Sequence, residues 1–191
     1  AKWQPLQLPL TEFDKAVPFL PWTFLIYTSD YLLIIFAVFM IREKEDFISF
    51  SRMMFIALVI SGIFFWVFPT TYPRPSYPSI ENRWVQAAMD LVYLADSPNN
   101  CFPSMHVALT SIAAFSLRKK SKAVVGLFLV WTLAVIGSTL TTKQHYLADV
   151  IGGGLVVAAV IFLEKQLFNR FDQRFTKLSR VIENLGVKRN F

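Results

Sequence analysis

The chain has one cysteine and only two histidines among its 191 residues, and this scarcity excludes several kinds of chemistry. The single cysteine, Cys101, allows no internal disulfide and no cysteine-based zinc site. Cysteine phosphatases carry an arginine six residues after the nucleophile, and this sequence has Val107 at that position. Carboxylates are scattered along the chain without the spacing of a metal site, so we expect neither a metal nor another cofactor.

Charge is also sparse, because charged residues make up 17% of the sequence whereas hydrophobic residues make up 54%. This composition predicts an integral membrane protein. The net charge of +6 comes from short basic clusters between apolar runs, which is typical of residues that contact anionic lipid headgroups. We therefore expect membrane lipids as partners and no nucleic acid.

Five apolar segments are candidates for membrane spans, and they lie at residues 20–41, 53–68, 103–117, 123–140 and 146–163. Several are shorter than the roughly 20 residues of a full crossing, so we expect their ends to extend into the neighbouring loops. No internal repeat divides the sequence. The pattern predicts an all-α, polytopic transmembrane helix bundle that forms a single domain over residues 1–191.

The basic residues predict how the bundle lies in the membrane. Most of the 19 Lys and Arg residues fall within 42–52, 118–122 and the tail 164–191. The positive-inside rule places these segments, including the C-terminus, in the cytoplasm, as expected for a protein of the plasma membrane. The N-terminal segment 1–19 and the loops 69–102 and 141–145 then face the extracytoplasmic side.

The long outer loop contains a candidate interfacial helix. Three prolines interrupt the chain before Ser79, which we expect to cap a helix that runs to about Leu94. Apolar residues recur in it at helical spacing, namely Ile80, Trp84, Ala87, Ala88 and Leu91. The pattern indicates either a helix in the lipid interface or a packed lid without lipid contact.

Both histidines fall at the outer ends of predicted spans. His145 precedes Asp149 by four residues, a spacing that lets the carboxylate hold one ring nitrogen and leaves the other free to attack or to accept a proton. This pair taken alone is equally compatible with a structural contact between helices. Asp30 lies within the first span, where an acidic side chain usually has a partner or a function.

The segment before His106 predicts an anion site. Pro103 suits the first turn of a helix, whose unpaired N–H groups attract anions, and the Ser104 hydroxyl and the Met105 N–H can add to this. His106 lies in the same turn and can act as a general acid. Pro-Ser-x-His alone is as compatible with an ordinary helix start.

Two basic residues complete the outer cluster, Arg74 and Lys143. The planar guanidinium of arginine suits bidentate contact with phosphate, and a lysine from the facing loop can supply a second positive charge. An isolated arginine in a loop is usually only solvated. Here, however, the basic residues, both histidines and Asp149 are all expected on one side of the membrane.

These residues together resemble the type 2 phosphatidic acid phosphatase superfamily, whose motifs are K-x6-R-P, P-S-G-H and S-R-x5-H-x3-D. The matching segments are Arg74-Pro75, Pro103 to His106 and His145 to Asp149, in the family's order. Three motif positions differ here, because Val67, Met105 and Thr139 stand where the family has Lys, Gly and Arg. The chain is most similar to divergent members such as the inositol phosphorylceramide synthase-like branch.

The resemblance implies a metal-independent phosphatase acting on a lipid phosphate monoester or diphosphate at the outer face of the membrane. In this family His145 would form a phosphohistidine, Asp149 would orient it and His106 would protonate the leaving group. Phosphate oxygens would be held by the remaining candidates, which are Arg74, Ser104, Met105 and Lys143. The family's six spans would place one further span before Ala1.

Three other functions stay open at this stage. A lipid headgroup phosphotransferase would use the same site with an alcohol as acceptor. A transporter would use the basic residues and histidines as an anion path, but it should also have polar residues deep in several spans. A scaffold without activity is suggested by the missing basic residues and opposed by the presence of His106, His145 and Asp149.

Overall fold

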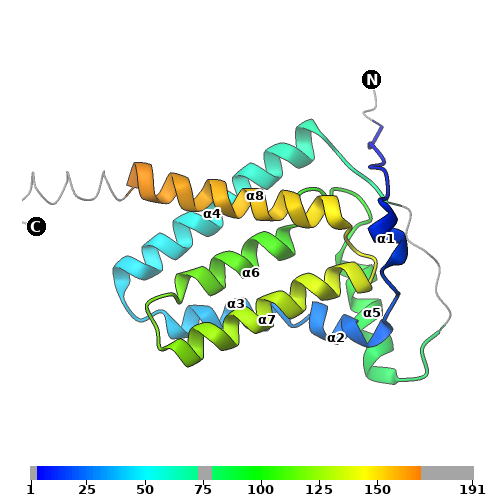
Figure 1. Ribbon diagram of the computed structural model, residues 1–191, viewed down its shortest axis with the longest axis horizontal. Helices are drawn as coiled ribbons and strands as arrows, with labels where there is room; N and C mark the ends of the chain where they lie inside the picture. The colour runs from blue at the N-terminus through cyan, green and yellow to red at the C-terminus, as the bar shows by residue number, and fades with distance from the viewer. Residues whose placement is uncertain (1–3, 73–78, 169–191) are drawn as a thin grey trace, which may run out of the picture.

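The computed structural model describes residues 4–72 and 79–168, and helices form the scaffold of this part of the chain (Figure 1). The helices are α1 (Glu12–Ala16), η1 (Pro21–Thr23), α2 (Phe24–Tyr27), α3 (Asp30–Met40), α4 (Lys44–Val67), α5 (Arg83–Ala95), α6 (Met105–Ser116), α7 (Lys122–Thr141), α8 (Leu147–Leu163) and the π-helical η2 (Glu164–Phe168). Four segments are long and apolar enough to cross a membrane, namely Pro21–Met40, Lys44–Val67, Lys122–Thr141 and Leu147–Gln166. The prediction of a helical membrane bundle is confirmed.

The third predicted span corresponds to α6, which is the central helix of the bundle. It has 12 residues and thus a length of about 18 Å, well short of the roughly 30 Å hydrocarbon core. It packs against α3, α4, α7 and α8, which surround it (Figure 1). Because its neighbours shield it from lipid, α6 can be shorter than a full crossing.

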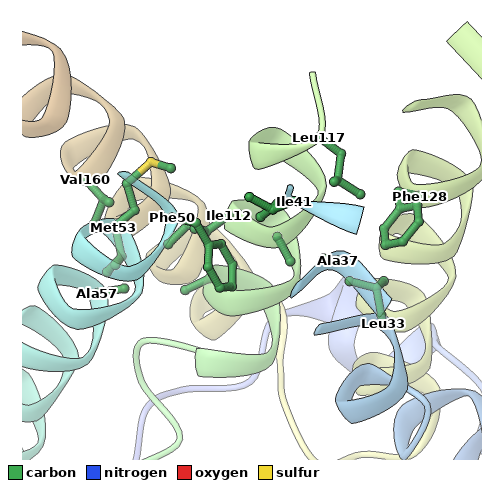
Figure 2. Packing of buried hydrophobic residues seen from close by; sticks show 13 residues of the cluster. Leu33, Ala37, Ile41, Phe50, Met53, Ala57, Ile112, Leu117, Phe128 and Val160 are labelled. Carbon is green, nitrogen blue, oxygen red and sulfur yellow. The ribbon is translucent and has the colours of Figure 1, made fainter. Parts of the chain in front are cut away.

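The core around α6 contains large and small side chains from all of the surrounding helices (Figure 2). Leu33, Met53 and Ile112 are almost completely buried. So are four alanines, Ala37, Ala57, Ala108 and Ala113. Small residues let helices approach closely, which favours association in lipid, where apolar burial alone gives little driving force.

The first span, predicted over 20–41, is the segment Pro21–Met40, and a turn at residues 28–29 divides it into two helices. The Thr28 hydroxyl donates to the Phe24 carbonyl at 3.0 Å, and the Ser29 hydroxyl donates to the Ile26 carbonyl at 2.6 Å. Such side-chain bonds compete with the helical ladder. As a result α2 ends at Tyr27, and α3 begins at Asp30.

The second span begins at Lys44, nine residues before the predicted start at residue 53. The additional turns contain charged residues that form ion pairs with other segments. Lys119 contacts Asp46 at 2.6 Å, and Arg52 contacts Glu164 at 2.8 Å. The charged residues lower the hydropathy of these turns, so the apolar pattern starts later than the helix.

Helix α5 lies at the end of the bundle where α8 begins (Figure 1), but the predicted cap is wrong. Asn82, and not Ser79, is the N-cap, since its side chain accepts from the N–H groups of Trp84 and Val85. One face packs on α2 through buried residues, which are Val85, Ala88, Met89 and Val92. Trp84, Leu91 and Leu94 remain exposed, so the helix is packed on one side and presents an apolar surface on the other.

Candidate functional site

The structure brings the two histidines into contact at one end of the bundle. His106 lies in the first turn of α6, and His145 lies in the turn between α7 and α8. His106 Nδ1 and His145 Nε2 are 3.3 Å apart, with the ring centroids 5.5 Å apart. Two residues separated by 39 positions thus form one cluster, which the sequence analysis expected from their positions at span ends.

Asp149 lies behind His145. Its Oδ2 atom is 3.4 Å from His145 Nδ1, and the carboxylate is completely buried. The pair is made across the start of α8, since the helix begins at Leu147 and His145 precedes it. The structure shows no hydrogen bond at this distance, but a nearby carboxylate favours a proton on Nδ1, and Nε2 is the atom that faces His106.

Two further donors hold the Asp149 carboxylate in place. The Tyr146 N–H donates to Oδ2 at 2.9 Å, and the Tyr72 hydroxyl donates to Oδ1 at 3.2 Å. Burial and the neighbouring Asp149 charge raise the pKa of Tyr72 well above its ordinary value, so its hydroxyl remains a donor. The sequence analysis did not identify Tyr72, which lies in the outer loop with no local pattern.

His106 is surrounded by groups that the sequence analysis did not assign to the site. Its Nε2 atom lies 3.6 Å from an Asp30 oxygen and 4.0 Å from an Asp96 oxygen. The Tyr27 hydroxyl donates to Asp96 at 2.6 Å and lies 3.2 Å from His106 Nδ1. Asp30 is an acidic residue within a span, and the sequence does not indicate its partner. In the structure its neighbour is His106.

Ser104 is the N-cap of α6, and its Oγ atom accepts from the Val107 N–H at 3.4 Å. This bond uses an oxygen lone pair, so the hydroxyl hydrogen can still be donated. The N–H groups of Met105 and His106 belong to the first turn, where a helix provides no acceptors. The start of α6 thus retains the donors expected of an anion site.

Helices α6 and α8 meet closely beside these donors. The Ser104 N–H donates to the Asp149 carbonyl at 3.0 Å. A Cβ atom on Gly153 would lie 2.6 Å from the Ser104 carbonyl oxygen, and one on Gly152 would lie 2.5 Å from the Phe102 ring. These two glycines permit the close packing of the helices, and the contact links the two segments that carry the histidines.

Of the two predicted basic residues, Lys143 is described, and its ammonium binds the N-terminal segment. The Lys143 ammonium donates to the carbonyl oxygens of Asp14 and Val17. Arg74 lies outside the described residues. Thr139, at the family's arginine position, is buried, and its carbonyl accepts from the N–H groups of Gln144 and His145. Within residues 4–72 and 79–168, no group of three or more His, Cys, Asp or Glu side chains is arranged to hold a metal ion.

The family comparison agrees with this geometry, because the family model of the PAP2 superfamily matches residues 5–163. The chain belongs to the PAP2 superfamily. Comparisons with curated proteins and with solved structures found no match. Membership in the PAP2 superfamily supports phosphatase-type activity, and the four apolar helices support an integral membrane location.

Proposed function

We propose that this PAP2-superfamily protein hydrolyses a lipid phosphate monoester or diphosphate at the extracytoplasmic face of the membrane, with His145 as nucleophile. The observation that carries the proposal is the arrangement of His145, whose Nδ1 atom is backed by buried Asp149 and whose Nε2 atom faces His106. A nucleophile next to an oriented base or acid is the arrangement that covalent catalysis requires.

The proposed reaction has two steps. His145 Nε2 forms a bond to phosphorus while the bond from phosphorus to the leaving oxygen breaks, and His106 donates a proton to that oxygen. Water then attacks the phosphohistidine, His106 accepts a proton from it, and the bond between phosphorus and nitrogen breaks. The direct contact of 3.3 Å between the rings must open to admit the phosphoryl group.

His106 suits the role of acid because carboxylates lie close to its second nitrogen. Asp30 and Asp96, at 3.6 and 4.0 Å, are near enough to orient the ring and to exchange a proton with it during the reaction. Phosphate oxygens would be bound by the Ser104 hydroxyl and by the N–H groups of Met105 and His106, with Arg74 as a further candidate ligand. The proposal does not use Lys143, whose ammonium bonds to carbonyl oxygens.

A lipid leaving group fits the apolar surface of the bundle. The bundle presents large exposed apolar side chains, among them Phe39, Phe55, Trp66, Leu127 and Leu155. In a membrane these side chains contact lipid tails, so a substrate that is itself a lipid reaches the site without leaving the bilayer. The positive-inside rule supports an outer site and a cytoplasmic C-terminus.

One observation favours a second candidate, a lipid headgroup phosphotransferase. Asp30, Asp96 and Asp149 surround the two histidines. A phosphodiester carries one negative charge, whereas a monoester carries up to two, so such a site repels the diester less. An alcohol would then replace water in the second step.

The test is phosphate release from a panel of lipid phosphates in detergent with EDTA present. The intact chain is compared with His145→Ala, His106→Ala and the control Glu12→Gln, a residue on the exposed surface of α1. Release that survives EDTA and is lost only in the histidine variants supports hydrolysis. Transfer of a labelled headgroup to an added alcohol, without phosphate release, would support the phosphotransferase, and neither activity would overturn both proposals.

A further inference from the structure

The N-terminal segment before the first span is bound to the turn that carries His145. The Leu20 N–H donates to the Thr141 carbonyl at 3.0 Å, at the end of α7. Asp14 accepts from the Leu147 N–H at 2.8 Å, at the start of α8. Contacts from one segment therefore fall on both sides of the catalytic histidine, and Figure 1 shows α1 beside this end of the bundle.

Asp14 connects two helices through its two oxygens. Oδ2 accepts from the Thr11 N–H and hydroxyl at 2.9 and 2.6 Å, whereas Oδ1 accepts from Leu147. The side chain is buried, and burial alone would raise its pKa. The hydrogen bonds from Thr11 and Leu147, together with the Lys143 charge, outweigh burial and hold the pKa of Asp14 below its ordinary value.

Asp14 adds a remote cap to α8, whose local capping contact is the Tyr146 N–H that donates to Asp149. The Leu147 N–H is the first of the helix and has no acceptor within it. The Asp14 carboxylate, 133 positions away in the sequence, supplies that acceptor and a negative charge at the positive end of the helix dipole. The start of α8 sets the separation between His145 and Asp149, so this remote cap bears on the catalytic pair.

Lys143 binds the same segment from the other side of His145. Its ammonium donates to the carbonyls of Asp14 and Val17, and its backbone has a left-handed φ of 57°. Because the side chain is fixed on the N-terminal segment, the turn between α7 and α8 is held at residues 143 and 147. His145 lies midway between these two points.

We propose that Asp14 and Lys143 are positioning residues, which hold the turn so that His145 Nε2 faces the phosphoryl group. The activity part of this proposal rests on the proposed function, because it takes His145 as the nucleophile. Lys143 acts here through the chain and not as a phosphate ligand.

The first test compares Asp14→Asn with the control Glu12→Gln in the full chain, which changes an exposed side chain of the same helix. An asparagine has a single acceptor oxygen, so it cannot bind both Thr11 and Leu147 as the carboxylate does. We expect Asp14→Asn to lower kcat by about tenfold or more with KM changed less than about twofold, and Glu12→Gln to stay near the wild type. Thr11→Ala removes only the hydroxyl donor to Asp14, so its kcat should lie between the two.

Lys143→Met and the double variant test whether both residues act on the same turn. We expect Lys143→Met to lower kcat with little change in KM, and the double variant to be less impaired than the product of the single effects. A rise in KM with unchanged kcat in Lys143→Met would mean that the lysine binds substrate. Equal kcat in Asp14→Asn and Glu12→Gln would also overturn the proposal.

Hydrogen exchange supplies a readout that does not need activity. We expect the amides of a peptide covering residues 142–150 to exchange faster in Asp14→Asn and Lys143→Met than in Glu12→Gln, while amides of α6 stay unchanged. Unchanged exchange in this peptide would overturn the proposal whatever the activity shows. If the wild type hydrolyses no substrate, the proposed function fails, and exchange alone decides whether the segment holds the turn.

Discussion

The Nδ1 atom of His106 and the Nε2 atom of His145 face each other at 3.3 Å, and each ring has carboxylate on its other side. Asp149 lies behind His145, and Asp30 with Asp96 lies behind His106. The two nitrogens that do not face a carboxylate therefore face each other. Because both rings are held from behind by carboxylates, one ring can act as nucleophile while the other moves a proton.

Asp149→Asn is expected to lower kcat by about 10² to 10⁴-fold, because an amide no longer fixes the His145 tautomer. Steady-state kinetics on the best lipid substrate measures the effect. The matched change Asp90→Asn, on the exposed side of α5, should leave kcat within about twofold of the wild type. Equal rates in the two variants would remove Asp149 from the mechanism.

Tyr72→Phe tests one donor to the same carboxylate. Losing one of three contacts to Asp149 should reduce kcat by about three- to tenfold, since a hydrogen bond to a charged group contributes about 1.5–3 kcal/mol, only part of it in the transition state. The control is Tyr31→Phe, because Tyr31 lies on the exposed side of α3. Tyr93→Phe is less suitable, because Tyr93 packs against the buried cluster of α2 and α5. If kcat were unchanged in Tyr72→Phe, the contacts with Tyr146 and His145 would be enough to keep the Asp149 carboxylate in position.

Asp30→Asn and Asp96→Asn test the support of His106. Asp96→Asn removes a negative charge beside His106, so the rate should fall by about tenfold, and the alkaline limb of the pH–rate profile should move to lower pH. Asp30→Asn changes the other contact of the same ring nitrogen and should also lower the rate. The profile of kcat from pH 5 to 9 is the measurement, and an unshifted alkaline limb in Asp96→Asn would mean that this carboxylate does not act on His106.

Gly153→Ala tests the contact between α6 and α8. A Cβ atom there would lie 2.6 Å from the Ser104 carbonyl oxygen, so the helices must separate, at a cost of about 1–3 kcal/mol. Gly154→Ala is the control, since a Cβ atom at that position meets nothing within 4 Å. Thermal unfolding in detergent should show a lower midpoint for Gly153→Ala only, and similar midpoints would contradict the close contact.

The histidine cluster and the helical bundle could be predicted from the sequence because hydropathy sets the span ends and both histidines lie at them. The partners of His106 could not be predicted from the sequence. Asp30 is a visible anomaly within an apolar span, but its neighbour depends on the break after Tyr27. Asp96 ends a helix in the outer loop, and nothing in the local sequence directs it toward α6.

Lys143 illustrates a different limit of sequence reasoning. Its position in an outer loop next to His145 predicts a phosphate ligand, because charge and proximity are all that the sequence provides. The carbonyl oxygens that bind its ammonium belong to Asp14 and Val17, more than a hundred residues earlier. Backbone acceptors have no sequence signal, so a lysine that binds them resembles a free one.

Trapping the covalent intermediate tests the central claim most directly. The enzyme is mixed with the panel lipid that gives the fastest release, carrying ³²P in its phosphate, then quenched in alkali, digested and analysed by mass spectrometry. We predict phosphate on His145, with none in His145→Ala. Phosphate on a different residue, or rapid turnover with no labelled histidine under these conditions, would contradict the account.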